Sequence, residues 1–140
     1  MSRILAIDHG LKRSGIAVTD PLRIIATALD SVPTTELLHR LQRYVAVEAV
    51  EGFVVGLPAG LNGRPTDGTA GVLTFIRELQ GAFPGHWVEV VDERFTSRIA
   101  QQTLLASGKG RMARREKGQL DRISATIILQ SWMAGGGRRI

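Results

Sequence analysis

Short aliphatic runs alternate with amphipathic stretches along the chain. Runs bounded by turn residues predict buried strands, and apolar residues at three- and four-residue spacing predict helices. In chain order, the expected elements are strands at 3–8, 15–19 and 23–29, a helix around 37–45, a strand at 52–56, a helix around 72–79, a strand at 87–91, a helix from 96 to 108 and a last helix at 121–134. The first three strands are too close in sequence for crossover connections, so they should form an antiparallel meander. The later strands alternate with helices, which predicts right-handed crossovers.

Local signals and chain length suggest where these elements begin and how many domains they form. Thr34 or Thr35 is the expected N-cap of the first helix, and Thr96 that of the third. A chain of 140 residues is long enough for one hydrophobic core and too short for two ordinary domains. We therefore expect one domain over residues 1–134, followed by a glycine- and arginine-rich tail at 135–140.

The order of the elements predicts a fold of the α/β class. Three antiparallel strands followed by strands joined through crossovers give a five-stranded mixed sheet flanked by helices. This pattern is typical of the ribonuclease H-like fold, in which the strand order 3-2-1-4-5 is usual. Because one fold hosts many activities, function has to be argued from particular side chains.

The composition excludes several classes of protein. The apolar content of 44% is that of a folded protein, and the absence of cysteine rules out disulfides and thiolate metal sites. The apolar run near the N-terminus is too short for a signal peptide, and no stretch approaches the length of a membrane span. We therefore expect a cytoplasmic protein that does not bind a membrane.

The charge distribution favours nucleic acid as the partner. The net charge is +5 and the isoelectric point is near 10.7. Basic residues also cluster before the last helix, which is more than solubility requires. The cluster consists of Lys109, Arg111, Arg114, Arg115 and Lys117, offset by Glu116.

Three carboxylates stand where a metal-dependent nuclease needs them. Asp8 ends the first apolar run, Glu93 follows the last strand, and Asp121 opens the last expected helix. Ligands of open α/β sheets collect outside the carboxyl ends of the strands, so these acids can converge. Clustered carboxylates repel one another unless cations lie between them, which predicts a site for divalent cations.

Each acid also has an ordinary structural explanation. Asp8 precedes a glycine and can simply stabilise a turn. Asp92 competes with Glu93 for the inward position, because neighbouring strand residues face opposite sides of the sheet. Asp121 can be a helix cap or a favourable charge at a helix start.

The strand at 52–56 bears on how Asp8 and Glu93 meet. If it lies between the strands that carry them, their backbones are ~9.5 Å apart. Gly56 has no side chain and would keep that gap open, although it can also be an ordinary turn glycine. His9 follows Asp8 in the turn and is expected to face water.

Four segments resemble motifs of the YqgF/RuvX family, a group of candidate pre-16S ribosomal RNA nucleases related to Holliday-junction resolvases. The segments are Asp8-His9-Gly10-Leu11-Lys12-Arg13-Ser14-Gly15, Gly56-Leu57-Pro58 with Asn62-Gly63, Asp92-Glu93-Arg94-Phe95-Thr96, and Lys117-Gly118-Gln119-Leu120-Asp121-Arg122-Ile123-Ser124-Ala125. Each segment alone is weakly specific, but the four occur in the family's order over nearly the whole chain. Ser14, Asn62 and Ser124 depart from the usual residues, and none of these departures removes one of the three candidate carboxylates.

The resemblance implies a ribonuclease H-like hydrolase that cuts RNA. Asp8, Glu93 and Asp121 would be the catalytic residues and would bind Mg²⁺ or Mn²⁺. Some related resolvases carry a fourth acid one turn after the helix aspartate, where this chain has Ser124 and Ala125. The implied activity is a metal-dependent endonuclease that matures the 5′ end of pre-16S ribosomal RNA.

The same resemblance and the charge distribution suggest which residues bind nucleic acid. They are Lys12, Arg13, Arg94, Lys109, Arg111, Arg114, Arg115 and Lys117. Two alternatives stay open: a Holliday-junction resolvase acting on branched DNA, and a non-catalytic nucleic-acid-binding factor in ribosome assembly or transcription. A resolvase would be a homodimer, whereas a ribosomal RNA nuclease can be a monomer or a homodimer.

Overall fold

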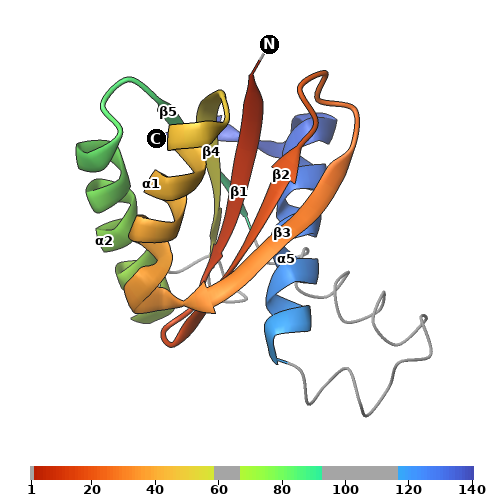
Figure 1. Ribbon diagram of the computed structural model, residues 1–140. Coiled ribbons are helices and arrows are strands. Elements are labelled where there is room, and N and C mark those ends of the chain that lie inside the picture. The colour runs from red at the N-terminus through yellow and green to blue at the C-terminus, as the bar shows by residue number, and fades with distance from the viewer. Residues whose placement is uncertain (1, 59–66, 93–116) are drawn as a thin grey trace, which may run out of the picture.

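A six-stranded mixed sheet forms the centre of the molecule (Figure 1). The computed structural model describes residues 2–58, 67–92 and 117–140. Across the sheet the strands follow the order β3-β2-β1-β4-β5-β6. Their bounds are β1 (Arg3–His9), β2 (Arg13–Thr19), β3 (Ala26–Pro33), β4 (Val50–Leu57), β5 (Trp87–Asp92) and β6 (Arg138–Arg139).

The strand pairing confirms the predicted topology. β1 and β2 are antiparallel, as are β2 and β3, so the first three strands form a meander. β4 pairs in parallel with β1 and with β5. The predicted order 3-2-1-4-5 is present, and one strand from the expected tail extends it.

Helices cover both faces of the sheet (Figure 1). The 3-10 helix η1 (Thr34–Glu36), α1 (Leu37–Val47) and α2 (Asp67–Ala82) lie on one face. α5 (Lys117–Ser131) lies on the other and continues into the π-helical turn η2 (Trp132–Gly136). The helix expected at 96–108 lies outside the described residues. Within the described residues, no helix is long and apolar enough to cross a membrane.

The alternation of side chains along β1 divides the core into two layers. Leu5 and Ile7 pack with α1 and α2, whereas Ile4 and Ala6 pack with α5, and all four are fully buried. A continuous aliphatic run is therefore needed, because both faces of this strand are covered. The same alternation places Asp8 on the α5 face of the sheet and His9 on the opposite face.

The strand predicted at 23–29 begins later, at Ala26. The Asp20 carboxylate accepts hydrogen bonds from the backbone N–H groups of Ile24 and Ile25, both at 2.7 Å. Arg23 takes a positive φ of 60° inside this turn. The first residues that looked extended in the sequence therefore form a turn and do not pair in the sheet.

The predicted threonine cap of the first helix is also wrong. Thr34 and Thr35 belong to η1, and α1 begins at Leu37 with no side-chain cap. The Thr34 hydroxyl instead donates to the carbonyl oxygen of Gly10 at 2.7 Å. Thr34 thus ties the end of the meander to the turn after β1.

The short edge strand β6 is held by side chains of β5 and η2. The Arg139 guanidinium lies 3.3 Å from Glu89 and 5.2 Å from the ring centre of Trp87. The Trp132 indole N–H donates to the same Glu89 carboxylate at 2.9 Å. These contacts recruit residues of the expected tail into the sheet and cover part of the β5 edge, and short, charged edge strands resist pairing with other chains.

Candidate functional site

The first candidate acid, Asp8, is brought to the last helix through Gly15. Asp8 and Gly15 pair directly across β1 and β2, so their Cβ directions share the α5 face. On that face Gly15 packs against the backbone of α5 so closely that a Cβ on it would collide with the carbonyl of Asp121. The structure therefore brings Asp8 and Asp121, 113 positions apart in sequence, to one place at the carboxyl end of β1.

Asp121 lies within α5 and does not cap it. The helix already includes Lys117, the first described residue of this segment, so Asp121 is at least one turn inside, and the helix start predicted at 121 was at least four residues late. The helix-cap explanation of this acid is therefore wrong. Its carboxylate points toward the meander, where it meets β2 and β3.

Two side chains hold the Asp121 carboxylate. The Ser31 hydroxyl donates to Oδ2 at 3.2 Å, and Arg13 Nε lies 3.7 Å from the same oxygen. Arg13 Nη2 also donates to the Ser31 hydroxyl at 3.1 Å, which closes a three-membered network. The Asp121 side chain is 21% exposed, so one edge of the site is open to solvent.

Ser31 is the residue that sequence analysis missed. It lies on β3, 90 positions before Asp121, and pairs with Gly15 across β2 and β3. Its neighbour Asp30 accepts a hydrogen bond from the backbone N–H of Ser31 at 2.8 Å and from Arg40 at 2.9 Å. No motif marks this serine, and only its position opposite Gly15 could have suggested it.

The alternation along β5 excludes Asp92 from the site. Val91 packs in the core layer under α5, whereas Val90 packs in the layer under α1 and α2. Asp92, two residues after Val90, is therefore on the α1 and α2 face, and it is exposed. Glu93, the acid chosen from the sequence, lies outside the described residues.

Gly56 lies where the sequence analysis placed it, between the strands of the first and second acid. Ile7 pairs with Val55, and Gly56 pairs with Val91, so Gly56 is next in register beside Asp8. Val54 packs under α5, which puts Gly56 on that same face. No side chain from β4 separates Asp8 from β5 at this level.

Among the predicted nucleic-acid-binding residues, Lys12 and Arg13 have described side chains. Lys12 is exposed at the β1–β2 turn, whereas Arg13 turns toward Ser31 and Asp121. Arg13 Nε is buried and makes no hydrogen bond within the described part of the chain. The side chains of Arg94, Lys109, Arg111, Arg114, Arg115 and Lys117 lie outside the described residues.

His9 does not face water as expected. Its ring stacks on Phe75 of α2, with centroids 4.9 Å apart and planes 24° from parallel. Burial lowers the pKa of His9, because it penalises the charged imidazolium more than hydrogen bonding and Glu78 favour it. His9 is therefore part of the α2 side of the sheet and no part of the acid site.

The donor chemistry of the site fits a hard divalent cation. Asp8 and Asp121 supply carboxylate oxygens, the ligands that Mg²⁺ and Mn²⁺ prefer. Within ranges 2–58, 67–92 and 117–140, no group of three or more histidine, cysteine or acidic side chains could hold a metal ion. A complete three-acid set would need Glu93, which is outside those ranges.

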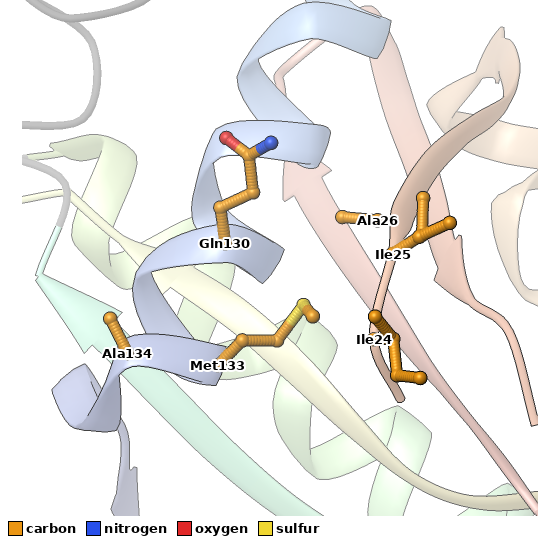
Figure 2. A pocket seen from close by; sticks show the side chains of 6 residues that line it. All are labelled: Ile24, Ile25, Ala26, Gln130, Met133 and Ala134. Atoms are coloured by element: carbon orange, nitrogen blue, oxygen red, sulfur yellow. The ribbon is translucent and has the colours of Figure 1, made fainter. Parts of the chain in front are cut away.

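A separate hollow of about 480 Å³ lies at the far end of α5 from Asp121 (Figure 2). Figure 2 shows Met133 reaching from η2 toward Ile24, and the hollow is also lined by Gln130, Ala134, Ile25 and Ala26. These lining residues include no ionisable group, so this hollow offers nothing for phosphodiester chemistry.

The family assignment follows from comparison with known proteins. The RuvX family, described as Holliday junction resolvases, matches residues 2–135. The chain belongs to this family. A candidate pre-16S rRNA nuclease of Porphyromonas gingivalis is 51% identical over 133 residues, covering 95% of this chain and 96% of the relative. A relative of the same name from Bacteroides thetaiotaomicron is 48% identical with the same coverage of both chains.

Solved structures show the same fold at low sequence identity. RuvC of Thermus thermophilus in complex with a Holliday junction substrate aligns over 100% of both chains, with a TM-score of 0.59 and 14% identity. A further structure of this RuvC aligns over 99% of both chains, with a TM-score of 0.56 and 13% identity. The predicted ribonuclease H-like fold is thereby confirmed for this RuvX-family chain.

Proposed function

We propose that this RuvX-family protein is a metal-dependent endonuclease that cleaves RNA in the maturation of the 5′ end of pre-16S ribosomal RNA. The observation that carries the proposal is the close packing of Asp121 on Gly15, directly across the strand pair from Asp8. The names of relatives with 48% to 51% identity support ribosomal RNA as the substrate. The cytoplasm is the compartment that this role implies.

Asp8, Glu93 and Asp121 would together bind Mg²⁺ or Mn²⁺. When bound, such ions lower the pKa of a coordinated water and stabilise the departing oxygen of a phosphodiester. The chain's own contribution is orientation. Ser31 and Arg13 hold the Asp121 carboxylate, and Gly15, which has no side chain, lets the backbone of α5 at Asp121 pack close to β2 beside Asp8. Arg13 would also place a positive charge beside the negatively charged phosphate.

The test is cleavage by the purified chain with Mg²⁺ or with Mn²⁺. Precursor 16S RNA is offered beside a control RNA of equal length, and products are mapped at single-nucleotide resolution. Asp8→Asn and Asp121→Asn should each abolish cleavage, since each removes a carboxylate ligand. Asp92→Asn is the matched control, because it removes an acid from the opposite face, and it should cleave like the wild type.

A Holliday-junction resolvase is the second candidate, favoured by the description of the family and by the RuvC fold. It would cut a synthetic four-way junction symmetrically and would be a dimer at the assay concentration. If the protein cleaves the junction in preference to precursor RNA, and Asp8→Asn abolishes that cleavage, the substrate of this site is branched DNA. Cleavage that survives in both aspartate variants would come from a contaminant or from a different site. Binding of RNA without cleavage of either substrate by the wild type would instead leave a nucleic-acid-binding factor.

A further inference from the structure

A second cleft opens on the face of the sheet opposite the acid site. Its volume is about 460 Å³, within the range of small-ligand pockets. One wall is a stripe along α2 formed by Gly71, Thr74, Phe75 and Glu78, which follow each other at helical spacing.

The opposite wall and the floor of the cleft come from other elements. Thr35 of η1 and Leu38 of α1 line the wall that faces α2. His9, the last residue of β1, also lines the cleft, stacked on Phe75. The cleft therefore combines an aromatic surface with hydroxyl groups and one carboxylate.

The cleft and the acid site share one edge of the sheet. Asp8 and His9 are consecutive residues of β1, and their side chains point to opposite faces. A single-stranded nucleic acid with a phosphate at Asp8 would reach His9 by passing around this end of β1.

The lining selects a base over a phosphate. Unpaired bases stack on aromatic rings, histidine included. Phe75 is buried, at 5% exposure, and stacks behind the partly exposed His9 ring, so His9 offers the aromatic surface of the cleft. The Glu78 carboxylate would repel a phosphate group, and it only accepts hydrogen bonds. It therefore favours a partner with N–H donors, such as the amino group of cytosine, adenine or guanine.

We propose that this cleft binds one unpaired, amino-bearing nucleobase of the substrate strand, next to the phosphate held at Asp8. The proposal rests on the proposed nuclease function. Its consequence is a preference for certain nucleotides near the cleavage point.

Gly71 provides a way to fill the cleft without disturbing the fold. A Cβ on Gly71 would meet nothing within 4 Å, and the same is true of Gly81 in the same helix, outside the cleft lining. Replacing either glycine by leucine should favour the helix, because glycine is a poor helix former. Gly71→Leu and Gly81→Leu are thus matched variants that differ in whether the cleft is blocked.

The first experiment measures binding of labelled single-stranded RNA by fluorescence anisotropy in EDTA, so that no cleavage is required. Gly71→Leu should weaken binding about fivefold or more, the loss expected for one stacked base, while Gly81→Leu binds like the wild type. Thermal melting of both variants checks that they are folded. Equal affinities of the two folded variants would overturn the proposal.

The second experiment tests the identity of the base. The probes are an oligouridylate and the same oligomer with one central cytidine, which differ at the exocyclic amino group. Wild type should prefer the cytidine probe about fivefold, and Glu78→Met, which removes the acceptor oxygens, should bring this ratio close to one. A ratio unaffected by Glu78→Met would overturn the assignment to an amino-bearing base. Because both assays omit metal, the cleft can fail while cleavage by Asp8 and Asp121 stands, and the reverse also holds.

Discussion

Gly15 packs against Asp121 with no room for even one methyl group, because a Cβ on Gly15 would overlap the Asp121 carbonyl. Gly15 also pairs with Asp8 on one side and with Ser31 on the other. A single glycine in β2 therefore sets the distance between the helix that carries one acid and the strand that carries the other.

Replacing Gly15 by alanine should separate the two acids. The added methyl group would push α5 away from β2, at a cost of about 1–3 kcal/mol in the free energy of unfolding. The rate of cleavage should fall by more than this loss of stability explains, and half-maximal cleavage should need a higher Mg²⁺ concentration. Urea unfolding and a Mg²⁺ titration of cleavage measure both effects.

Gly85→Ala is the control for this substitution, since a Cβ there meets nothing within 4 Å. It should leave the Mg²⁺ requirement of cleavage unchanged. If Gly15→Ala shows a wild-type Mg²⁺ titration, close packing at Gly15 does not position the acids.

Ser31 should matter for catalysis although no motif includes it. Ser31→Ala removes the hydroxyl that donates to Asp121 and accepts from Arg13. Asp121 is a metal ligand under the proposed function, and loss of an orienting contact to a metal ligand typically weakens metal binding or activity about 10- to 100-fold. We expect weaker Mn²⁺ binding by calorimetry and slower cleavage, with the free energy of unfolding little changed.

Ser31→Thr tests whether the hydroxyl is what counts. Threonine keeps the hydroxyl and suits a strand, so this variant should recover most of the Mn²⁺ affinity. Equal losses in the alanine and threonine variants would point to packing around β3 and away from the hydrogen bond.

The fold could be predicted because its signals are local. The run from Ile4 to Ile7 is buried on both faces, and such continuous runs distinguish a central strand directly. The start of β3 was harder to predict. The Asp20 carboxylate accepts hydrogen bonds from the backbone N–H groups of residues that looked extended, so these residues form a turn and not the strand. β6 was missed because a glycine- and arginine-rich segment resembles a tail until Glu89 and Trp87 supply its contacts.

The sequence suggested Asp8 and Asp121 as candidate acids, but it did not suggest the residues that contact Asp121. Asp8 comes directly after the aliphatic run of β1, and the resemblance to the RuvX family marks Asp121. Ser31 has no such signal, because its role depends on the register of β2 with β3 and on where α5 crosses them. Contacts between residues 90 positions apart require the fold to be known first.

Lys12 and Arg13 should affect RNA in different ways, although they are adjacent. Lys12 is exposed, so Lys12→Gln should remove one phosphate contact and reduce the salt dependence of binding to single-stranded RNA by about 0.7 in slope. Arg13 contacts Ser31 and Asp121, so Arg13→Gln should in addition raise the Mg²⁺ concentration needed for cleavage. Binding titrations at several salt concentrations and a Mg²⁺ titration of cleavage separate the two. An unchanged Mg²⁺ requirement in Arg13→Gln would mean that Arg13 acts only on the RNA.

The pair of Asp30 and Arg40 beside Ser31 should make stability depend on pH. Partial burial of Asp30 disfavours its charged form, but the hydrogen bonds from Arg40 and from the backbone of Ser31 outweigh this. The pKa of Asp30 therefore lies below its usual value of 3.8. A carboxyl group whose pKa is lower in the folded state stabilises the protein above its unfolded pKa, and this contribution disappears as the pH falls through the folded pKa.

Asp30→Asn should therefore lower the free energy of unfolding at pH 7 by at most about 1 kcal/mol, because the Asp30 side chain is 37% exposed and solvent screens the pair. Below about pH 4 the difference from the wild type should shrink toward zero, since wild-type Asp30 also becomes neutral. Urea unfolding at a series of pH values measures this difference, and Arg40→Gln should show the same convergence. A cost of Asp30→Asn that stays constant down to the acid limit of folding would show that the carboxylate's charge does not stabilise this corner of β3.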